Sequence, residues 1–174
     1  MIGLSGKDGG LIKAKKKMFG KSRKRGSDET IDLGLVGDVS KIDPHIIKSL
    51  EKDSCIPVIA PIGVGQRGET FNINADHVAA NIAGALKAEK LIILTDVPGI
   101  MDKKDKIIST LTKKEIKQLI NNKIIKEGML PKVQACLDAL DQGVSKTHII
   151  DGRIPHCLLL EIFTKEGIGT EIKK

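Results

Sequence analysis

From residue 55 onward, short runs of β-branched residues alternate with segments of helical periodicity. This alternation predicts strands joined by right-handed helical crossovers, which is an open, mainly parallel α/β sheet sandwiched by helices. The expected strands cover residues 55–62, 70–74, 90–95 and 147–151, with a closing strand in 167–172. The expected helices cover residues 77–87, 112–122, 130–142 and 155–164. The first fifty residues are less regular, and we expect a hairpin around residues 32–38.

Two of the expected strands carry further information. Residues 90–95 are almost continuously apolar, which is typical of an inner parallel strand covered on both faces. Residues 55–62 contain Pro57 and Pro61, and proline favours the edge or the ends of a strand because it cannot donate to the ladder.

The chain has 174 residues, which fits one domain or half of a larger two-lobed protein. It has no Trp, no Tyr and only three Phe, so the core must be aliphatic. Modules that bind single-stranded nucleic acid stack bases on aromatic side chains, and this composition argues against them. No apolar run approaches the ~18 residues of a membrane span. Three cysteines without metal-ligand spacing, and no secretory signal, predict a cytoplasmic protein without a metal site of its own.

The positive charge is concentrated in one segment. Between Lys13 and Arg25 lie eight basic residues and no acidic one; of the 29 basic residues in the chain, 21 remain outside it against 22 acidic residues. The segment could be an arm that binds polyanions, which would make the chain a non-catalytic binding module. Without aromatic residues among the basic ones we favour a solvated loop, and nucleic acid is not an expected partner.

Polar side chains stand where the strand at 70–74 gives way to a helix. Asn72 and Asn74 alternate to one face, and Asp76 follows at the expected start of the helix. Asparagine amides can both donate to and accept from an amide or carboxylate ligand. Ligands of open α/β sheets bind at the carboxyl ends of strands, so these residues form a candidate site. Asp76 is also a candidate N-cap.

Three other features have both a functional and a structural interpretation. The turn at 94–100 offers backbone groups to a nucleotide base and ribose, or is a plain strand-to-loop connection. Lys132 lies in a first helical turn, where the helix dipole disfavours a cation, so its partner is a phosphate unless it is simply solvated. His148 is more often a half-buried structural residue than a ligand in such an apolar run. The glycine-rich stretch at 5–10 could cradle an anion only weakly, since it lacks P-loop spacing.

Taken together, the motifs resemble those of the acetylglutamate kinases, in the amino-acid kinase family. The matching stretches are SGKDGGLIKA (5–14), DLGLVGDV (32–39), IPVIAPIG (56–63), NINADHVAANIAGAL (72–86), EKLIILTDVPGI (89–100), EGMLPKV (127–133), HIIDGRIPHCLLLEIFT (148–164) and GIGTEI (167–172). The resemblance implies the amino-acid kinase fold. It also implies transfer of the ATP γ-phosphoryl group to the side-chain carboxylate of N-acetyl-L-glutamate, giving an acyl phosphate in arginine biosynthesis.

The resemblance also implies roles for individual residues. Asn72, with Asn74 nearby, would bind acetylglutamate, Asp76 would orient the catalytic lysines, and Lys132 would stabilise the transferring phosphoryl group. Mg²⁺ on the ATP phosphates would supply further charge neutralisation. The residues implied for the nucleotide are Thr95, Asp96, Val97, Pro98, Gly99, Ile100, Met101, Ile124, Ile125 and Lys126. Those implied for an arginine effector are His148, Glu161 and Gly167.

The sequence departs from the family in one large respect. A Lys-x-Gly-Gly strand end, a Gly-Gly-Gly-Pro loop and a substrate-binding arginine belong to the family's N-terminal lobe, and that lobe has no counterpart in residues 1–174; the KDGG of residues 7–10 belongs instead to the matching stretch 5–14. The resemblance therefore implies a C-terminal, ATP-binding part that has little activity alone. It implies a homo-oligomer for the full-length enzyme, or a separate N-terminal lobe as partner. A carbamate or uridylate kinase is the alternative within the family.

Overall fold

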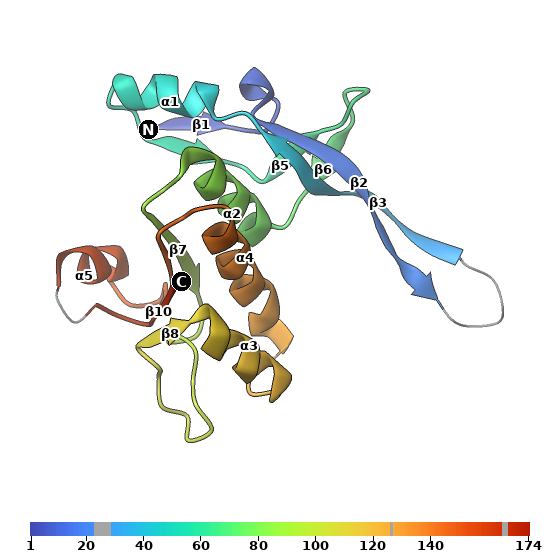
Figure 1. Cartoon of the computed structure of the whole chain (residues 1–174). Coiled ribbons are helices and arrows are strands. Elements are labelled where there is room, and N and C mark those ends of the chain that lie inside the picture. Colours follow the sequence, from blue (N-terminus) through green and yellow to red (C-terminus); the bar gives the residue numbers. More distant parts are fainter. Residues whose placement is uncertain (23–28, 126, 165–166) are drawn as a thin grey trace. The chain divides into compact units, whose positions relative to one another are not determined.

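A computed structural model describes residues 1–22, 29–125, 127–164 and 167–174, which form two compact units (Figure 1). The first unit is Met1–Val78 and the second is Ala79–Lys174. Helix α2 (Ala75–Leu86) contains the boundary between them, so the chain passes from one unit to the other within a helix.

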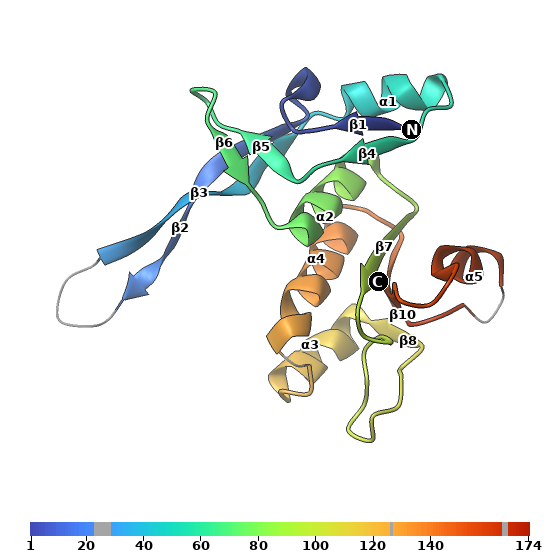
Figure 2. The same ribbon diagram turned by 180° about the vertical axis from the view of Figure 1, so that it is seen from behind.

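The second unit is built on a four-stranded sheet. Its strands, in spatial order, are β7 (Lys90–Thr95), β9 (Lys146–Asp151), β10 (Thr170–Lys173) and β8 (Thr110–Thr112). Strand β7 is parallel to β9 and β10 is parallel to β8, while β9 and β10 are antiparallel. Helices α3 (Lys113–Asn121) and α4 (Leu130–Asp141) cover one face and α5 (Cys157–Phe163) covers the other (Figures 1 and 2). The predicted α/β class is confirmed.

Helices α3 and α4 begin and end within about one residue of the predicted bounds. Thr112 caps α3 through its Oγ1, which accepts from the backbone N–H of Glu115 at 3.3 Å, and the Glu115 carboxylate accepts from Thr112 N at 2.7 Å. This is the predicted capping box. Helix α4 has Pro131 in its first turn, and Gly143, with φ +102°, follows its end.

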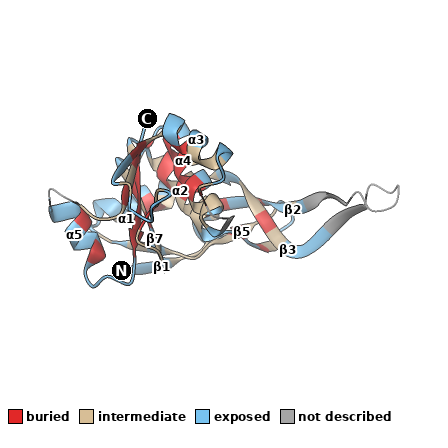
Figure 3. Cartoon of the chain, turned by 90° about the horizontal axis from the view of Figure 1, so that it is seen from below, coloured by how far each residue is buried: buried red, intermediate tan, exposed pale blue. Residues whose placement is uncertain are grey.

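Helix α4 belongs to an aliphatic core (Figure 3), which also contains Ile149 of β9. Six of the twelve residues of α4 are buried, and Val133 and Ala135 are completely inaccessible to solvent. Every residue of β9 after Lys146 is buried. The core is filled by Ile, Leu, Val and Ala, as the composition predicts.

The prediction that residues 90–95 form an inner strand is wrong. In the described sheet β7 stands at the edge and pairs only with β9, which is the inner strand. Only Leu91 and Ile93 of β7 are buried, and Leu94 is 45% exposed. The apolar run was a poor guide because an edge strand can be as apolar as an inner one when one of its faces is buried.

The first unit combines a parallel strand pair with a small closed barrel. Strand β1 (Ile2–Leu4) pairs with β4 (Pro57–Ile59), and helix α1 (His45–Lys52), which the sequence analysis did not predict, precedes β4. The barrel strands are β2 (Ile12–Ser22), β3 (Glu29–Ile42), β6 (Thr70–Asn72) and β5 (Ile62–Val64). The predicted strand at 55–62 is thus two strands, separated at Ala60 and Pro61.

A long hairpin of β2 and β3 dominates this unit, and its turn was predicted in the wrong place. Residues 32–38 lie within β3 rather than at a turn. The register passes from Lys16 opposite Gly37 to Met18 opposite Asp32, so extra residues bulge out of β3. Gly34 adopts φ +69° in this bulge, and its N–H donates to Asp32 Oδ1 at 2.8 Å. The glycines therefore mark a bulge and not a chain reversal.

Residues 13–22 of the basic segment lie in strand β2 of this hairpin (Figure 2). Lys16 Nζ is 2.6 Å from Asp32 Oδ2 and Lys17 Nζ is 3.0 Å from Asp38 Oδ1, so carboxylates of β3 neutralise part of its charge. Arg23, Lys24 and Arg25 lie outside the described residues. None of the helices in the described ranges has the length and apolar character needed to cross a membrane.

Candidate functional site

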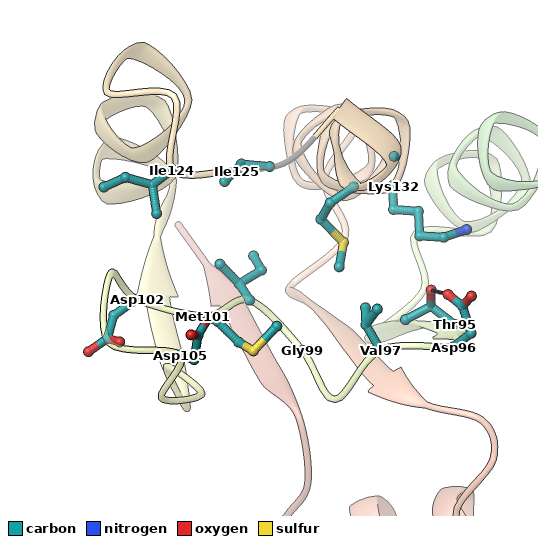
Figure 4. Close-up of a pocket in the computed structure, with 13 residues that line it drawn as sticks. Thr95, Asp96, Val97, Gly99, Met101, Asp102, Asp105, Ile124, Ile125 and Lys132 are labelled. Atoms are coloured by element: carbon teal, nitrogen blue, oxygen red, sulfur yellow. Dashed lines mark hydrogen bonds between the residues drawn. The ribbon is translucent and has the colours of Figure 1, made fainter.

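A pocket of about 400 Å³ opens at the carboxyl end of β7 (Figure 4). This volume is in the range of small-molecule sites. Its wall is mainly apolar and its polar groups come from the chain just after β7 and from the start of α4. The lining residues are Thr95, Asp96, Val97, Gly99, Ile100, Met101, Asp102, Asp105, Ile124, Ile125, Gly128, Met129 and Lys132.

The segment after β7 is held close to the sheet. The N–H of Ile100 donates to the buried Oγ1 of Thr170 on β10 at 2.8 Å. Gly99 has φ +148°, and a Cβ there would lie 2.8 Å from the same hydroxyl oxygen. Only glycine allows the backbone to approach the sheet at this point. One side of the pocket is therefore rigid backbone.

Asp102 closes the loop that follows. Its Oδ1 accepts from the N–H of Lys106 at 3.0 Å and of Lys104 at 2.7 Å. These two hydrogen bonds, that from Lys106 first, hold the pKa of Asp102 below its ordinary value. The Asp102 carboxylate therefore stabilises the loop at the rim of the pocket through these hydrogen bonds.

Lys132 supplies the positive charge of the pocket. It lies in the first turn of α4, and its side chain extends toward Thr95 and Asp96 (Figure 4). Backbone N–H groups at a helix start lack helical partners and attract anions. A lysine and a helix start on the same side of an apolar pocket can together bind a ligand with an apolar ring at one end and phosphates at the other.

The pocket gathers most of the residues predicted for a nucleotide. Eight of the ten line it, from Thr95 to Met101 without Pro98, together with Ile124 and Ile125. Lys126 is outside the described residues. Four further lining residues were not predicted from the sequence: Asp102, Asp105, Gly128 and Met129. Their position next to predicted lining segments was the only signal available for them.

Asn72, Asn74 and Asp76 belong to the first unit. Phe71 and Ile73 are buried and both asparagines are exposed, so the predicted alternation is confirmed. The prediction that Asp76 caps the helix is wrong. Helix α2 begins at Ala75, and the Oδ1 of Asn74 accepts from the N–H of His77 at 3.2 Å. Asn74 therefore performs the capping role, and Asp76 stands inside the first turn.

A second, more polar hollow of about 520 Å³ surrounds His148, Glu161 and Gly167. The Nδ1 of His148 is 2.6 Å from Glu161 Oε1 and its Nε2 is 3.3 Å from Glu171 Oε2, although neither nitrogen has the alignment of a hydrogen bond. His148 is 4% exposed, more buried than expected. Lys90 Nζ is 3.1 Å from the same Glu161 oxygen. The three residues predicted for an effector thus lie together in a charged cluster.

Glu161 joins α5 to the loop that follows it. Its Oε2 accepts from the N–H of Ile168 at 3.0 Å, and a Cβ on Gly167 would lie 2.8 Å from that oxygen. Burial alone would raise the pKa of Glu161, but the Ile168 N–H, Lys90 and His148 together lower it. Glu161 is therefore ionised and already has three partners.

The glycine-rich stretch at 5–10 folds into a turn around its own carboxylate. Asp8 Oδ2 accepts from the N–H of Ser5 at 2.7 Å and from its hydroxyl at 2.8 Å. Donors that an anion would need are used by Asp8, so this stretch makes a poor anion cradle. Within the described ranges, no three His, Cys, Asp or Glu side chains come together as a metal site.

The sequence profile of the Amino acid kinase family matches residues 2–151. Among curated relatives, the acetylglutamate kinase of Persephonella marina (strain DSM 14350 / EX-H1) is 55% identical over 98% of this chain and 58% of its own length. That of Geobacter sp. (strain M21) is 54% identical over 98% of this chain and 59% of its own length. The chain therefore spans a little under three fifths of these relatives.

Solved structures show the same fold. N-acetylglutamate synthase from Neisseria gonorrhoeae, complexed with coenzyme A and L-arginine, superposes with a TM-score of 0.82 over 98% of this chain and 37% of its own, at 28% identity. Carbamate kinase from Giardia lamblia bound to AMP-PNP superposes with a TM-score of 0.65 over 91% of this chain and 52% of its own, at 19% identity. The second likeness shows the fold alone.

Proposed function

Because this chain belongs to the amino acid kinase family, we propose that it is the ATP-binding part of an acetylglutamate kinase. The reaction would transfer the γ-phosphoryl group of ATP to the side-chain carboxylate of N-acetyl-L-glutamate. The name of the curated relatives at 53–55% identity supports this acceptor. The observation that carries the proposal is the pocket at the carboxyl end of β7, with Lys132 beside Thr95 and Asp96 (Figure 4).

The pocket supports a division of roles among its residues. Val97, Ile100 and Met101 offer apolar contacts to a purine, and Ile124 and Ile125 complete that wall. Lys132 would stabilise negative charge on the transferring phosphoryl group. Phosphoryl transfer requires positioning and charge stabilisation more than covalent chemistry, so a lysine at a helix start suits it.

The acceptor would bind in the first unit. Asn72 and Asn74 are exposed on the edge of β6 and at the start of α2, where amides can bind the acetamido and carboxylate groups of acetylglutamate. Asp76 would orient the catalytic lysines. Mg²⁺ would be held by the ATP phosphates, since no carboxylate cluster for it is found among the described residues. Little activity of residues 1–174 alone, and assembly of the enzyme into a homo-oligomer, remain predictions.

A second ligand is supported at the charged cluster around His148, where we propose an arginine effector. Glu161 offers a carboxylate that a guanidinium binds well. A relative of 28% identity was solved with L-arginine. Because Glu161 already contacts Lys90 and His148, arginine would have to displace one of them, so we expect weak binding. We also propose a cytoplasmic location, which suits cysteines that are thiols and not disulfides, as Cys55, Cys136 and Cys157 are.

The test is a titration of the chain with MgATP by calorimetry, followed by addition of acetylglutamate, carbamate or uridylate. We expect saturable MgATP binding and a further heat only with acetylglutamate, with little release of ADP because residues 1–174 alone are expected to have little activity. The matched variant is Lys132→Ala, which should weaken binding of ATP more than that of adenosine because it removes a phosphate contact. A response to carbamate or uridylate in place of acetylglutamate would identify the alternative kinase. Absence of nucleotide binding would contradict the proposal.

A further inference from the structure

Two acidic residues end neighbouring strands near the nucleotide pocket. Asp96 follows β7 directly and lines the pocket, while Asp151, the last residue of β9, does not line it. Thr95 is the register partner of Asp151, and the N–H of Gly152 donates to the Thr95 carbonyl at 2.8 Å. A triphosphate bound here would meet the repulsion of both carboxylates unless a cation balances them.

Arg153 is built to balance one of these charges. Its Nε lies 3.0 Å from Asp151 Oδ1 and its Nη2 lies 2.8 Å from Oδ2, which is a bidentate pair. The backbone N–H of Arg153 also donates to Oδ1 at 2.9 Å. The hydrogen bonds from Arg153 lower the pKa of Asp151, and the same pair raises the pKa of Arg153. Both groups are therefore ionised.

The pair differs in exposure between its members. The Asp151 side chain is 8% exposed, whereas that of Arg153 is 65% exposed. The turn that carries Arg153 is joined to the end of β7 by the hydrogen bond from the Gly152 N–H to the Thr95 carbonyl, and the charge of Asp96 adds to the raised pKa of Arg153. A buried carboxylate is thus covered by a guanidinium that remains open to solvent next to the pocket.

We propose that Arg153 is a positioning residue for the nucleotide, which neutralises Asp151 and reduces the negative field of Asp96 where the phosphates bind. This inference rests on the nucleotide site proposed above. Arg153 does not line the pocket, so it acts through the two carboxylates. With Lys132 at the start of α4, it sets the charge balance at that end: two cations against two carboxylates.

Substitutions of the two partners separate an electrostatic role from a structural one. Arg153→Gln and Asp151→Asn both break the ion pair, but they change the charge near the phosphates in opposite directions. Arg153→Lys also breaks the bidentate geometry and keeps the charge. In the double variant Asp151→Asn/Arg153→Gln both charges are absent. Circular dichroism melts of each variant establish that it is folded before its MgATP affinity is measured by calorimetry.

We expect Arg153→Gln to weaken MgATP binding roughly three- to tenfold at low salt, and less at high salt because the repulsion is screened. Asp151→Asn should bind as tightly as the wild-type chain or more tightly. Arg153→Lys and the double variant should remain within about twofold of wild type, since neither adds net negative charge.

Other outcomes would overturn the inference. Equal weakening by Arg153→Gln and Asp151→Asn, or weakening by Arg153→Lys as large as by Arg153→Gln, would show that the pair only supports the turn. Wild-type affinity of Arg153→Gln would show that the pair is irrelevant to the nucleotide. A wild-type chain that binds no MgATP would instead overturn the nucleotide site itself, and this inference with it.

Discussion

The two units of the chain are held together in different ways. The second unit, Ala79–Lys174, contains one continuous aliphatic cluster, to which α4 alone contributes six buried residues. In the first unit, Met1–Val78, much of the long hairpin is exposed, with Met18 at 55% and Leu35 at 66%. Elements of the second unit are positioned by burial of apolar faces, and those of the first mainly by backbone pairing and turn chemistry.

The contrast appears in how far certain carboxylates are buried. In the first unit, Asp8 accepts from the Ser5 N–H and Asp32 accepts from the Gly34 N–H, so carboxylates with access to solvent shape a turn and a bulge of their own segments. In the second unit, Glu161 and Asp151 are buried and form ion pairs with Lys90 and Arg153. Local carboxylates can shape a loop without a core. Buried ones need the rigid surroundings that a core provides.

The largest expected loss of stability comes from a substitution in the packed core of the second unit. Ile149 on β9 is fully buried, whereas Leu35 on β3 is 66% exposed. Ile149→Ala should lower the free energy of unfolding by about 2–5 kcal/mol, because it removes buried methyl groups and leaves a cavity. Leu35→Ala should stay within about 0.5 kcal/mol. Chemical denaturation monitored by circular dichroism measures both, and equal losses would show that the two regions do not differ in packing.

Two glycines, one in each unit, allow the backbone of the two units to be compared. Gly169 (φ +76°) and Gly34 (φ +69°) both adopt left-handed conformations. A Cβ at Gly169 would overlap the Ile149 carbonyl oxygen, while at Gly34 nothing lies within 4 Å. Gly34→Ala should cost about 1–2 kcal/mol from the backbone alone, and Gly169→Ala about 1–3 kcal/mol more from the overlap. If Gly34→Ala proved the more damaging in denaturant, the contrast would be reversed.

A smaller effect concerns the start of α2. Asn74→Ala removes the side-chain acceptor for the His77 N–H and should destabilise the protein by about 0.5–2 kcal/mol. Asp76→Ala should cost less, because Asp76 lies within the first turn and does not occupy the cap position. Thermal melts of the two variants rank them. A larger loss for Asp76→Ala would restore the original prediction that it is the cap.

The smallest expected effect is on how the free energy of unfolding depends on pH, through His148 in the second unit. Burial lowers the pKa of His148 below its ordinary value, against the opposing pull of Glu161 and Glu171 and with support from Lys90 and Lys146. The unfolded state therefore takes up the proton first. The contribution of His148 to the free energy of unfolding is therefore fully present above the pKa of histidine in the unfolded state, about 6.5, and it is lost as the pH falls below that value.

Glu161 adds to this dependence at lower pH. Its pKa is held below the ordinary value, so the stability that it contributes is present above about pH 4.5 and is lost as the pH falls through its folded pKa. Denaturation midpoints measured between about pH 7.5 and 5.5 report the effect of His148 alone, because Glu161 titrates at lower pH. His148→Asn should flatten the curve in that window. A wild-type curve that rises on acidification would contradict the sign.

The sequence predicted the second unit better than the first for a physical reason. Helix α4 has an apolar face, a proline in its first turn and a glycine after its end, and α3 has a capping box; all these signals are local. In the first unit the same local signals misled, because Gly34 lies in a bulge within β3 where a turn was expected. Helix α1 was missed, since its only completely buried apolar residue is Ile47.

The parts of the site that consist of continuous segments of sequence could be predicted. The segment after β7 and the start of α4 were recognised from the sequence, and the structure brings them into one pocket. Sequence reasoning could not find what depends on strand pairing. The edge position of β7 and the proximity of Arg153 to Asp96 follow from the register of β7 with β9, which no local pattern encodes.

The central claim, that the nucleotide binds in the second unit at the end of β7, is tested most directly by amide hydrogen exchange with and without MgATP. We expect protection in residues 95–102 and 127–133, and a reduction of that protection in Lys132→Ala at the same nucleotide concentration. Protection confined to β2 and β3, along the basic segment, would contradict the claim and would favour a module that binds polyanions.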